Sequence, residues 1–319
     1  MSNTLPNFRL LRPDTIQAAV AMLQDHENAK LCAGGTDLIV NMRRGLATPE
    51  VLIDLGTVLE MQQITRDDQG LHIGAGVTLS ELAENTPHNA ITQAALAIAG
   101  PGHRFAATVG GNLCLDTRCQ YYNQSHWWRK SNDFCLKYRG DTCHVSPSGN
   151  RCRAAFSGDL APALLVLNAE IDIAGPEGIR RIPLADLYTG EGDVYLTLAK
   201  NEVVTQIHLP PSAATSTYGK IRIRGALDFP LAGVAIAAEK SATETTFRIA
   251  LTGTNSRPVL LDAPAPFSQN DNPETYFAAL NKAVQKAASP QRSTITTPLF
   301  RKQSVGAVAA RLAQELANG

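Results

Sequence analysis

The sequence lacks a charge imbalance, a long hydrophobic run and a basic leader. Its 319 residues include 29 basic and 29 acidic side chains, so the formal net charge is zero, and no basic stretch suggests binding to nucleic acid or to an anionic membrane. No window approaches the roughly 18 apolar residues of a membrane helix, and the first residues lack the pattern of a signal peptide. We therefore expect a cytoplasmic chain that binds small ligands or protein partners.

Cysteine is scarce, and four of the six cysteines fall in one short stretch, at Cys119, Cys135, Cys143 and Cys152. In a reducing cytoplasm, clustered cysteines are more often metal ligands or redox groups than disulfides. The intervals of fifteen, seven and eight residues lack the close pairs of zinc ribbons and fingers. The spacing favours a [4Fe–4S] cluster held by four thiolates over a structural zinc ion, and inert buried thiols are a third reading.

Two glycine turns are present, and neither carries a complete nucleotide fingerprint. Residues 33–37 read Ala-Gly-Gly-Thr-Asp, and residues 108–112 read Thr-Val-Gly-Gly-Asn. The Gly-Lys-Ser/Thr ending of a nucleoside triphosphate loop is missing, as is the three-glycine dinucleotide spacing, so each turn alone is as compatible with an ordinary tight turn as with a phosphate site. Two such turns in successive lobes can embrace one pyrophosphate, so the pair predicts a dinucleotide. Cys32 and Cys114, beside these turns, are interpreted as packed thiols.

The order of expected elements predicts an α+β protein of more than one lobe. We expect an N-terminal βαβ-like lobe over residues 1–58, a middle lobe over 59–211 and a C-terminal α+β domain over 218–319. The prolines at 210–211 and the small polar run 212–217 form the expected linker.

Periodicity and capping signals place the elements within these lobes. Thr78 with Glu81 three residues later predicts a capping box. We expect helices at 14–26, from 38, through 83, at 273–288 and at 297–317. We expect strands at 30–33, 51–55, 71–75, 220–224, 234–238 and 247–252, and a hairpin formed by 170–173 and 181–184.

Four sequence segments carry a resemblance to a known family. The segments are the two glycine turns, Ser-Gly-Asp-Leu-Ala-Pro at 157–162 and Arg-Ile-Pro-Leu at 181–184. In order and spacing they resemble the FAD-binding medium subunit of the xanthine dehydrogenase and carbon monoxide dehydrogenase type of molybdenum hydroxylases. The likeness covers essentially the whole chain and implies the two-lobed FAD-binding fold of that family.

A stretch from about 116 to 155 interrupts the family pattern between the second glycine turn and the Ser-Gly-Asp motif. It resembles the iron–sulfur insertion in the beta subunit of 4-hydroxybenzoyl-CoA reductases. The matching text includes Asp-Thr-Arg-Cys at 116–119, Trp-Trp-Arg at 127–129, Cys-Leu-Lys-Tyr at 135–138 and Cys-His-Val at 143–145. This likeness implies one [4Fe–4S] cluster on Cys119, Cys135, Cys143 and Cys152.

The resemblance also implies which residues contact FAD. Asp159 matches an acidic residue near the adenosine ribose, and Lys220 matches a lysine near the isoalloxazine. Ile98 and Val204 match apolar neighbours of the flavin, although a buried Ile or Val is a core residue by default and an isolated lysine is as often a surface charge. The two pyrophosphate loops comprise Leu31, Cys32, Ala33, Gly34, Gly35, Thr36, Asp37 and Leu38, and Thr108, Val109, Gly110, Gly111 and Asn112.

The resemblance implies an electron-relay subunit with no organic substrate site and no catalytic side chain of its own. A large molybdenum-cofactor subunit and a small subunit with [2Fe–2S] clusters are the expected partners, in a dimer of heterotrimers. Reduced ferredoxin is the expected donor, with electrons passing through the insertion cluster, FAD and the small-subunit clusters to molybdenum, where the ring hydroxyl of 4-hydroxybenzoyl-CoA is removed. The alternatives are a hydroxylase subunit of the xanthine dehydrogenase kind, acting on another aromatic or heterocyclic compound, and a non-redox scaffold stapled by zinc.

Overall fold

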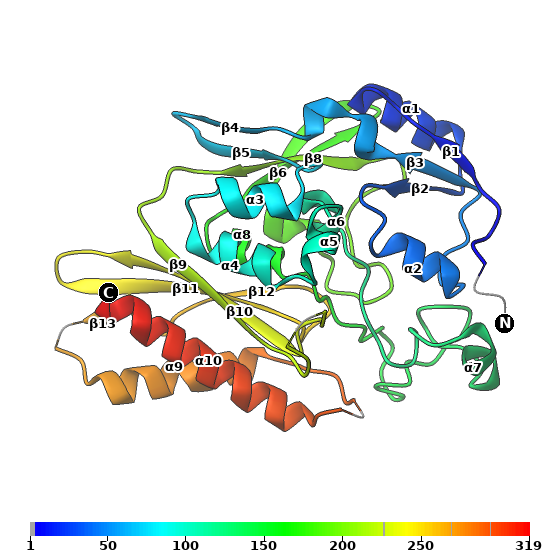
Figure 1. Ribbon diagram of the computed structural model, residues 1–319. Coiled ribbons are helices and arrows are strands. Elements are labelled where there is room, and N and C mark those ends of the chain that lie inside the picture. The colour runs from blue at the N-terminus through cyan, green and yellow to red at the C-terminus, as the bar shows by residue number, and fades with distance from the viewer. Residues whose placement is uncertain (1–3, 226, 269, 294) are drawn as a thin grey trace.

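The computed structural model describes residues 4–225, 227–268, 270–293 and 295–319. Three β-sheets carry the chain, and helices lie between and outside them (Figure 1). The predicted α+β class is confirmed. Within the described ranges, no helix is both long enough and apolar enough to cross a bilayer.

The N-terminal lobe is a small parallel sheet with two helices. Strand order is β1–β3–β2, and both neighbouring pairs are parallel, which confirms the predicted βαβ arrangement. The Thr15 hydroxyl accepts a hydrogen bond from the backbone N–H of Ala18 and so caps the first helix. The elements are β1 (Arg9–Leu11), α1 (Ile16–Asp25), β2 (Ala29–Cys32), α2 (Leu38–Arg43) and β3 (Val51–Asp54).

The middle lobe is an antiparallel sheet of order β4–β5–β8–β6–β7. Its predicted hairpin forms as β6 (Glu170–Gly175) and β7 (Gly178–Pro183), and the predicted capping box at Thr78 and Glu81 is present. The other strands are β4 (Ile64–Asp67), β5 (Gly70–Gly74) and β8 (Val203–Leu209). The helices are α3 (Leu79–Asn85), α4 (Asn89–Ala97), α5 (Pro101–Arg104), α6 (Val109–Leu113) and α8 (Leu160–Leu165), and the short 3-10 turns are Leu55–Thr57, Leu59–Met61 and Leu184–Leu187.

The C-terminal sheet has the order β12–β11–β10–β9, with β13 paired to β11. Its first strand corrects two predictions. Strand β9 (Thr215–Ile221) includes residues 215–217 of the expected linker, and it begins five residues before the expected strand at 220–224. Ser216 and Tyr218 are buried on this strand, so the short polar run is drawn into the sheet by pairing with β10. The remaining elements are β10 (Ala232–Lys240), β11 (Glu244–Thr252), β12 (Val259–Asp262), β13 (Phe267–Ser268), α9 (Pro273–Ala287) and α10 (Pro298–Asn318).

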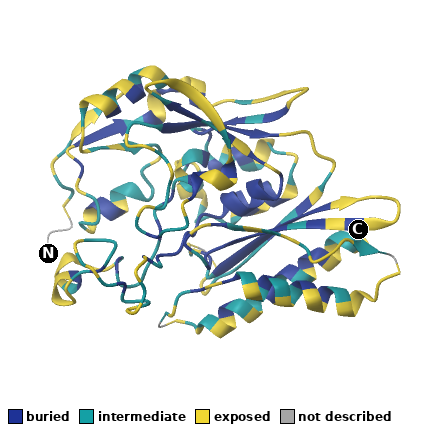
Figure 2. Cartoon of the chain, turned by 180° about the vertical axis from the view of Figure 1, so that it is seen from behind, coloured by how far each residue is buried: buried dark blue, intermediate teal, exposed yellow. Residues whose placement is uncertain are grey.

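Two hydrophobic cores meet at the C-terminal sheet. On β10, Ala235 and Ala237 join the core shared by the first two lobes, whereas Val234 and Ile236 face the core under α9 and α10. This alternation is the period of two expected of a strand buried on both faces. Figure 2 shows the resulting buried bands, with the exposed residues on the outer helices and in the loops.

The stretch 116–155 begins and ends at neighbouring positions in the fold. The backbone N–H groups of Arg118 and Ala155 each donate to the other's carbonyl oxygen, at 2.7 and 2.8 Å. Between them lies a loop with a single helix, α7 (His126–Ser131), which lies below α2 in the view of Figure 1. We call residues 118–155 the insertion loop.

Candidate functional site

The first glycine turn connects β2 to α2 and exposes a row of backbone donors. The N–H groups of Gly34, Gly35, Thr36 and Asp37 donate no hydrogen bond within the described part of the chain. Gly35 has a φ of +68°, a left-handed conformation that glycine adopts without strain. Successive unpaired N–H groups at the start of a helix form a cradle for an anion. The turn therefore fits a pyrophosphate.

The second glycine turn is the first turn of α6 and not an isolated loop. The Thr108 hydroxyl accepts a hydrogen bond from the N–H of Gly111 at 3.1 Å and caps the helix. Gly110 packs inward, where an added Cβ would lie 2.8 Å from the Cβ of Ala75. Gly111 is exposed, and an added Cβ there would meet only the Thr108 hydroxyl, at 3.1 Å. One glycine thus serves packing, and the other leaves the backbone open to a ligand.

The two turns lie against each other. A Cβ on Gly34 would fall 1.7 Å from the carbonyl oxygen of Ala106, a contact that only glycine permits. Ala106 lies two residues before the Thr108 cap, so the first cradle opens beside the second. The proximity that the sequence suggested for the paired turns is present in the structure.

Asp159 and Lys220 form a buried ion pair. Their charged atoms are 3.1 Å apart, and each side chain is about 5% exposed or less. The Tyr218 hydroxyl also donates to the Asp159 carboxylate, at 2.6 Å. Burial raises the pKa of Asp159 above its usual value, although Lys220 and Tyr218 oppose that shift. These two predicted flavin residues therefore contact each other, from the N-terminus of α8 and from β9.

The two predicted apolar neighbours of the flavin differ in how far they are buried. Val204 is buried in β8, as a core residue would be. Ile98 ends α4 and is only partly buried, and its carbonyl oxygen accepts a hydrogen bond from Arg104 at 3.1 Å. Contact of either residue with a flavin remains a prediction.

The four cysteines of the insertion loop line one small cavity. The other residues that line it also belong to the insertion loop; they are Tyr121, Tyr122, Leu136, Lys137, His144 and Ala154. Cys114 and Cys32 are not part of this wall. The sequence grouped Cys119, Cys135, Cys143 and Cys152 by position alone, and the structure brings their side chains around a common space.

The loop reaches this arrangement through an unusual backbone. Phe134 and Arg139, on either side of Cys135, have φ angles of +59° and +60°, and Asp133 has +54°. Such conformations cost about 1–3 kcal/mol each for non-glycine residues and persist only where the surroundings enforce them. A concentration of them at one cysteine indicates a loop shaped around the position of that sulfur.

The thiols are protected from water. Burial raises the pKa of Cys152 to about 12, even though Lys137 acts in the opposite direction, and burial also raises the pKa of Cys119. Burial likewise raises the pKa of Cys114 to about 12, and that of Cys32 is raised by burial and by Asp54. Thiols of this kind react little as free nucleophiles. A bound metal ion would stabilise the thiolate form, but the described part of the chain contains no group of three His, Cys, Asp or Glu side chains arranged to hold one.

The insertion loop is fastened to the first glycine turn. Arg118 forms an ion pair with Asp37 and donates to Asn41 at 3.4 Å, and its guanidinium carbon lies 4.7 Å from the centre of the Phe229 ring. Two further hydrogen bonds run from the loop to the segment after α2. They are Arg129 to the Gly45 carbonyl, at 2.9 Å, and the Tyr122 hydroxyl to the Leu46 carbonyl, at 3.4 Å. The cysteine cavity is thus anchored to the lobe that carries the first cradle.

Arg118 and Lys137 were missed by sequence reasoning. Both lie within the insertion, but their partners are remote in sequence, at Asp37 and at the Gly192 carbonyl. A basic residue in a loop reads as a solvated charge unless its partner is known. The only available signal was their position next to the cysteines, one residue before Cys119 and two after Cys135.

The fold and the paired cradles define an FAD-binding subunit of an oxidoreductase, and comparison with known proteins gives its family. Residues 6–212 match the family described as the FAD binding domain in molybdopterin dehydrogenase. The chain belongs to this family, and is an oxidoreductase subunit of the molybdenum hydroxylase type.

Individual relatives agree with this assignment. The FAD-binding subunit of aldehyde oxidoreductase from Escherichia coli K12 is 31% identical, over 87% of this chain and 92% of that protein. A xanthine dehydrogenase FAD-binding subunit from Escherichia coli O157:H7 is 28% identical over 70% of this chain, which spans just under two thirds of that relative, 66%. The crystal structure of a Cu,Mo-CO dehydrogenase, in its cyanide-inactivated form, contains a chain with the same fold, at a TM-score of 0.77 and 24% identity over 99% of this chain and 100% of that one.

Proposed function

We propose that the chain is the electron-transferring FAD and iron–sulfur subunit of a molybdenum-dependent reductase that removes the ring hydroxyl of 4-hydroxybenzoyl-CoA. The observation that carries this proposal is the cavity lined by Cys119, Cys135, Cys143 and Cys152. A flavin subunit of a hydroxylase needs no such cavity, because FAD alone couples one-electron carriers to a two-electron acceptor. A second redox group on the same chain is the simplest reason for four converging thiols.

The residues fit FAD and a [4Fe–4S] cluster. For FAD, the open N–H groups of residues 34–37 and the exposed Gly111 offer a pyrophosphate cradle, with Leu31–Leu38 and Thr108–Asn112 as its two sides. For the cluster, the buried thiols of Cys135, Cys143 and Cys152 and the partly buried thiol of Cys119 offer the thiolate-only ligand set that iron–sulfur groups take. When bound, these groups supply two-electron and one-electron chemistry, and the chain's own part is to hold them, exclude water and fix their distance.

A zinc staple is the competing occupant of the cysteine cavity. Zn–S bonds of about 2.3 Å in a tetrahedron place sulfurs about 3.8 Å apart. Among the described residues, no group of three His, Cys, Asp or Glu side chains is arranged to hold a metal ion. Analysis of iron and zinc therefore decides between the two occupants.

The charge of the insertion supports a protein donor of low potential. Residues 116–155 contain seven lysines and arginines and three aspartates, a net charge of +4 in a chain whose total is zero. The exposed Lys130, Arg139 and Arg151 favour encounter with an acidic electron carrier, and the exposed Asp133 and Asp141 oppose it. We propose reduced ferredoxin as that donor, a large molybdenum-cofactor subunit and a small [2Fe–2S] subunit as partners, and a dimer of heterotrimers as the assembly.

A hydroxylase of the opposite electron direction is the second candidate. It is favoured by the relatives, since the proteins of similar sequence include an aldehyde oxidoreductase and a xanthine dehydrogenase subunit. The two candidates differ in whether the intact complex accepts electrons from reduced ferredoxin or only delivers electrons from an oxidised substrate to an acceptor such as NAD.

The test is anaerobic purification of the complex, followed by analysis of iron, zinc, molybdenum and flavin. We expect four irons on this chain beyond those of the small subunit, no stoichiometric zinc, and reduction by ferredoxin. Cys119→Ser should lower iron and the broad visible absorption while FAD stays bound, and Cys114→Ser, the matched control outside the cavity, should change neither. Iron loss in the Cys114 variant alone, or oxidation of substrate as the only activity, would contradict the proposal.

A further inference from the structure

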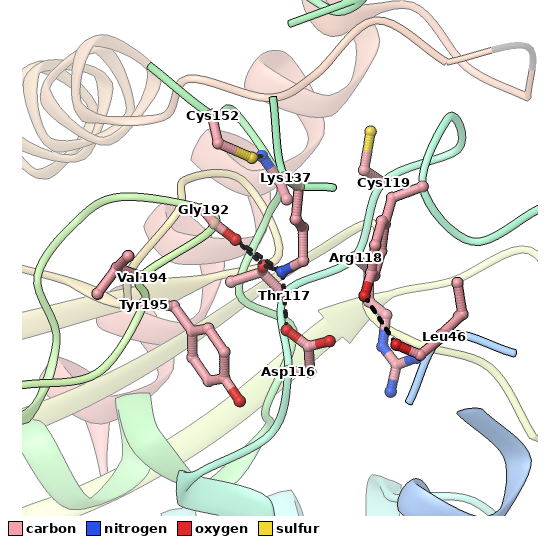
Figure 3. Close-up of polar contacts among 12 residues, drawn as sticks. Leu46, Asp116, Thr117, Arg118, Cys119, Lys137, Cys152, Gly192, Val194 and Tyr195 are labelled. Atoms are coloured by element: carbon pink, nitrogen blue, oxygen red, sulfur yellow. Dashed lines mark hydrogen bonds and ion pairs between the residues drawn. The ribbon is translucent and has the colours of Figure 1, made fainter. Parts of the chain in front are cut away.

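Lys137 places a buried positive charge at the wall of the cysteine cavity. Its side chain is 5% exposed, and its ammonium nitrogen lies 2.7 Å from a carboxylate oxygen of Asp116 and 2.7 Å from the Gly192 carbonyl, with a third hydrogen bond to the Thr117 hydroxyl (Figure 3). An ammonium has three donors and no acceptor, and here each donor has an oxygen. The three oxygens therefore hold the Lys137 nitrogen in one place at the cavity wall.

The position of this charge is enforced from two further sides. The ammonium lies 5.0 Å from the ring centre of Tyr122 and 5.2 Å from that of Tyr195, close enough for cation–π attraction. Gly192, whose carbonyl it binds, also packs on Cys152, because an added Cβ there would lie 2.8 Å from the Cys152 sulfur. Figure 3 shows Cys152 above the ammonium and Asp116 below it. The cation thus separates a carboxylate from a thiol.

Burial of a charged amine costs free energy unless an opposite charge or hydrogen bonds offset it. Holding the loop to Gly192 does not by itself require a charge. A neutral side chain could bridge Thr117 and Gly192. The carboxylate of Asp116 balances the ammonium but is 27% exposed, so solvent screens it more strongly than it screens Lys137. Asp193 also acts on Cys152, and the buried Arg129 stacks on Tyr122 and Tyr138. Among the lysines and arginines named here, Lys137 is the one that lines the cavity, where His144 also lies.

We propose that Lys137 is a positioning residue that raises the reduction potential of the iron–sulfur group held by the four thiolates, and that Asp116 offsets part of this effect. The inference rests on the proposed function. Four thiolates make the group anionic, and the addition of one electron makes it more so without forming or breaking a bond. A fixed cation in a dry site favours the reduced state, and a fixed anion disfavours it. The pair therefore sets the potential by opposing charges.

The experiment is a dithionite titration of the anaerobically purified full-length chain, followed by EPR, for the wild type, Lys137→Met, Lys137→Arg and Asp116→Asn. Lys137→Met keeps the length and apolar stem without the charge. At a fixed potential its reduced-to-oxidised ratio should fall about tenfold, a shift of about 59 mV for one electron. Asp116→Asn should move the ratio in the opposite direction, and Lys137→Arg should stay near the wild type.

The opposite signs separate electrostatic tuning from a purely structural role. If the Lys137→Met and Asp116→Asn proteins carry full iron and have the same reduction potential as the wild type, the inference is overturned and the proposed function is left intact. Shifts of the same sign would also overturn it, because simple loosening of the site would move both variants alike. If Lys137→Met fails to assemble iron, the Asp116→Asn and Lys137→Arg titrations decide. Absence of iron and of an EPR signal in the wild type would instead contradict the proposed function.

Discussion

At the residue scale, the site depends on side chains and glycines that each have a distinct physical task. Gly34 permits contact between the two turns, Gly110 permits packing on Ala75, and Gly111 keeps the backbone open. Two charged groups of the interior are paired, Asp159 with Lys220 and Lys137 with the partly exposed Asp116. Such pairs are costly to break from one side only.

Gly111→Val tests the exposed backbone of the second turn. The new side chain meets only the Thr108 hydroxyl, so the protein should fold, but its bulk should block approach of the pyrophosphate. We expect bound FAD to fall at least tenfold, a loss of about 1.4 kcal/mol in binding, as measured by flavin absorbance after gel filtration. Gly56→Val is the matched control, since Gly56 also donates to a capping side chain and its Cβ would meet Asp54 at 3.1 Å. Equal flavin in both variants would contradict the assignment.

Asp159→Ala should destabilise the flavin-free chain by about 3–5 kcal/mol, because it leaves the Lys220 ammonium buried without its carboxylate. Urea unfolding followed by circular dichroism measures this change. The double variant Asp159→Asn with Lys220→Met removes both charges and should recover most of the loss. If the single variant is as stable as the wild type, the pair is not formed in solution.

At the element scale, the regular elements followed from local signals and the shorter ones did not. The capping box of Thr78 and Glu81 predicted α3, and the Gly-Pro-Glu-Gly turn at 175–178 between two strand-like segments predicted the β6–β7 hairpin. Helix α6 was interpreted as a turn because two glycines disfavour a helix. The Thr108 cap and the packing of Gly110 on Ala75 stabilise it. The grouping of the four cysteines around one cavity could be predicted from their closeness in the sequence. The partnership of Lys137 with Gly192 was not, because it depends on a loop 55 residues away.

The β6–β7 hairpin and β8 are joined by a carboxylate that makes their pairing sensitive to pH. Burial alone would raise the pKa of Asp172, but hydrogen bonds from Arg181, at 2.7 and 3.1 Å, and with His208, at 2.8 Å, hold it below its usual value. A depressed carboxyl pKa stabilises the fold above the unfolded value of about 3.9, and this stability is lost as the pH falls through the folded pKa.

Asp172→Asn should therefore cost about 2 kcal/mol at pH 7, from the loss of charged hydrogen bonds. The difference from the wild type should shrink as the pH falls below about 4, because the carboxyl of the unfolded chain takes up a proton there before the carboxyl of the folded chain does. Urea unfolding at pH 7 and at pH 3 measures both quantities. A difference that stays constant across this range would show that the charge of Asp172 is not the cause.

At the scale of the whole molecule, the insertion loop stands outside both hydrophobic cores. None of its residues belongs to the core shared by the first two lobes or to the core under α9 and α10. The loop is held by the Arg118–Ala155 bridge, the Arg118–Asp37 ion pair and hydrogen bonds to Gly45 and Leu46. Its order must come mainly from these contacts and from whatever the thiols bind.

Removal of iron by an anaerobic chelator should therefore loosen residues 119–154 and leave both cores folded. Metal-coupled folding energy is confined to the segment whose conformation the metal fixes. Hydrogen exchange measured by mass spectrometry should show faster exchange in the loop and little change in β10 and β11. Loss of protection throughout the chain would mean that the loop supports the cores, contrary to the separation described above.

The Arg118–Ala155 bridge has a consequence for how such a protein arises. Because the loop departs and returns at paired neighbours, the strands and helices on either side keep the same path whether or not it is present. A single genetic insertion or deletion at this point can therefore add or remove the four thiols without redesigning any sheet. A lineage of flavin subunits can in this way gain or lose the cysteine cavity in one heritable event.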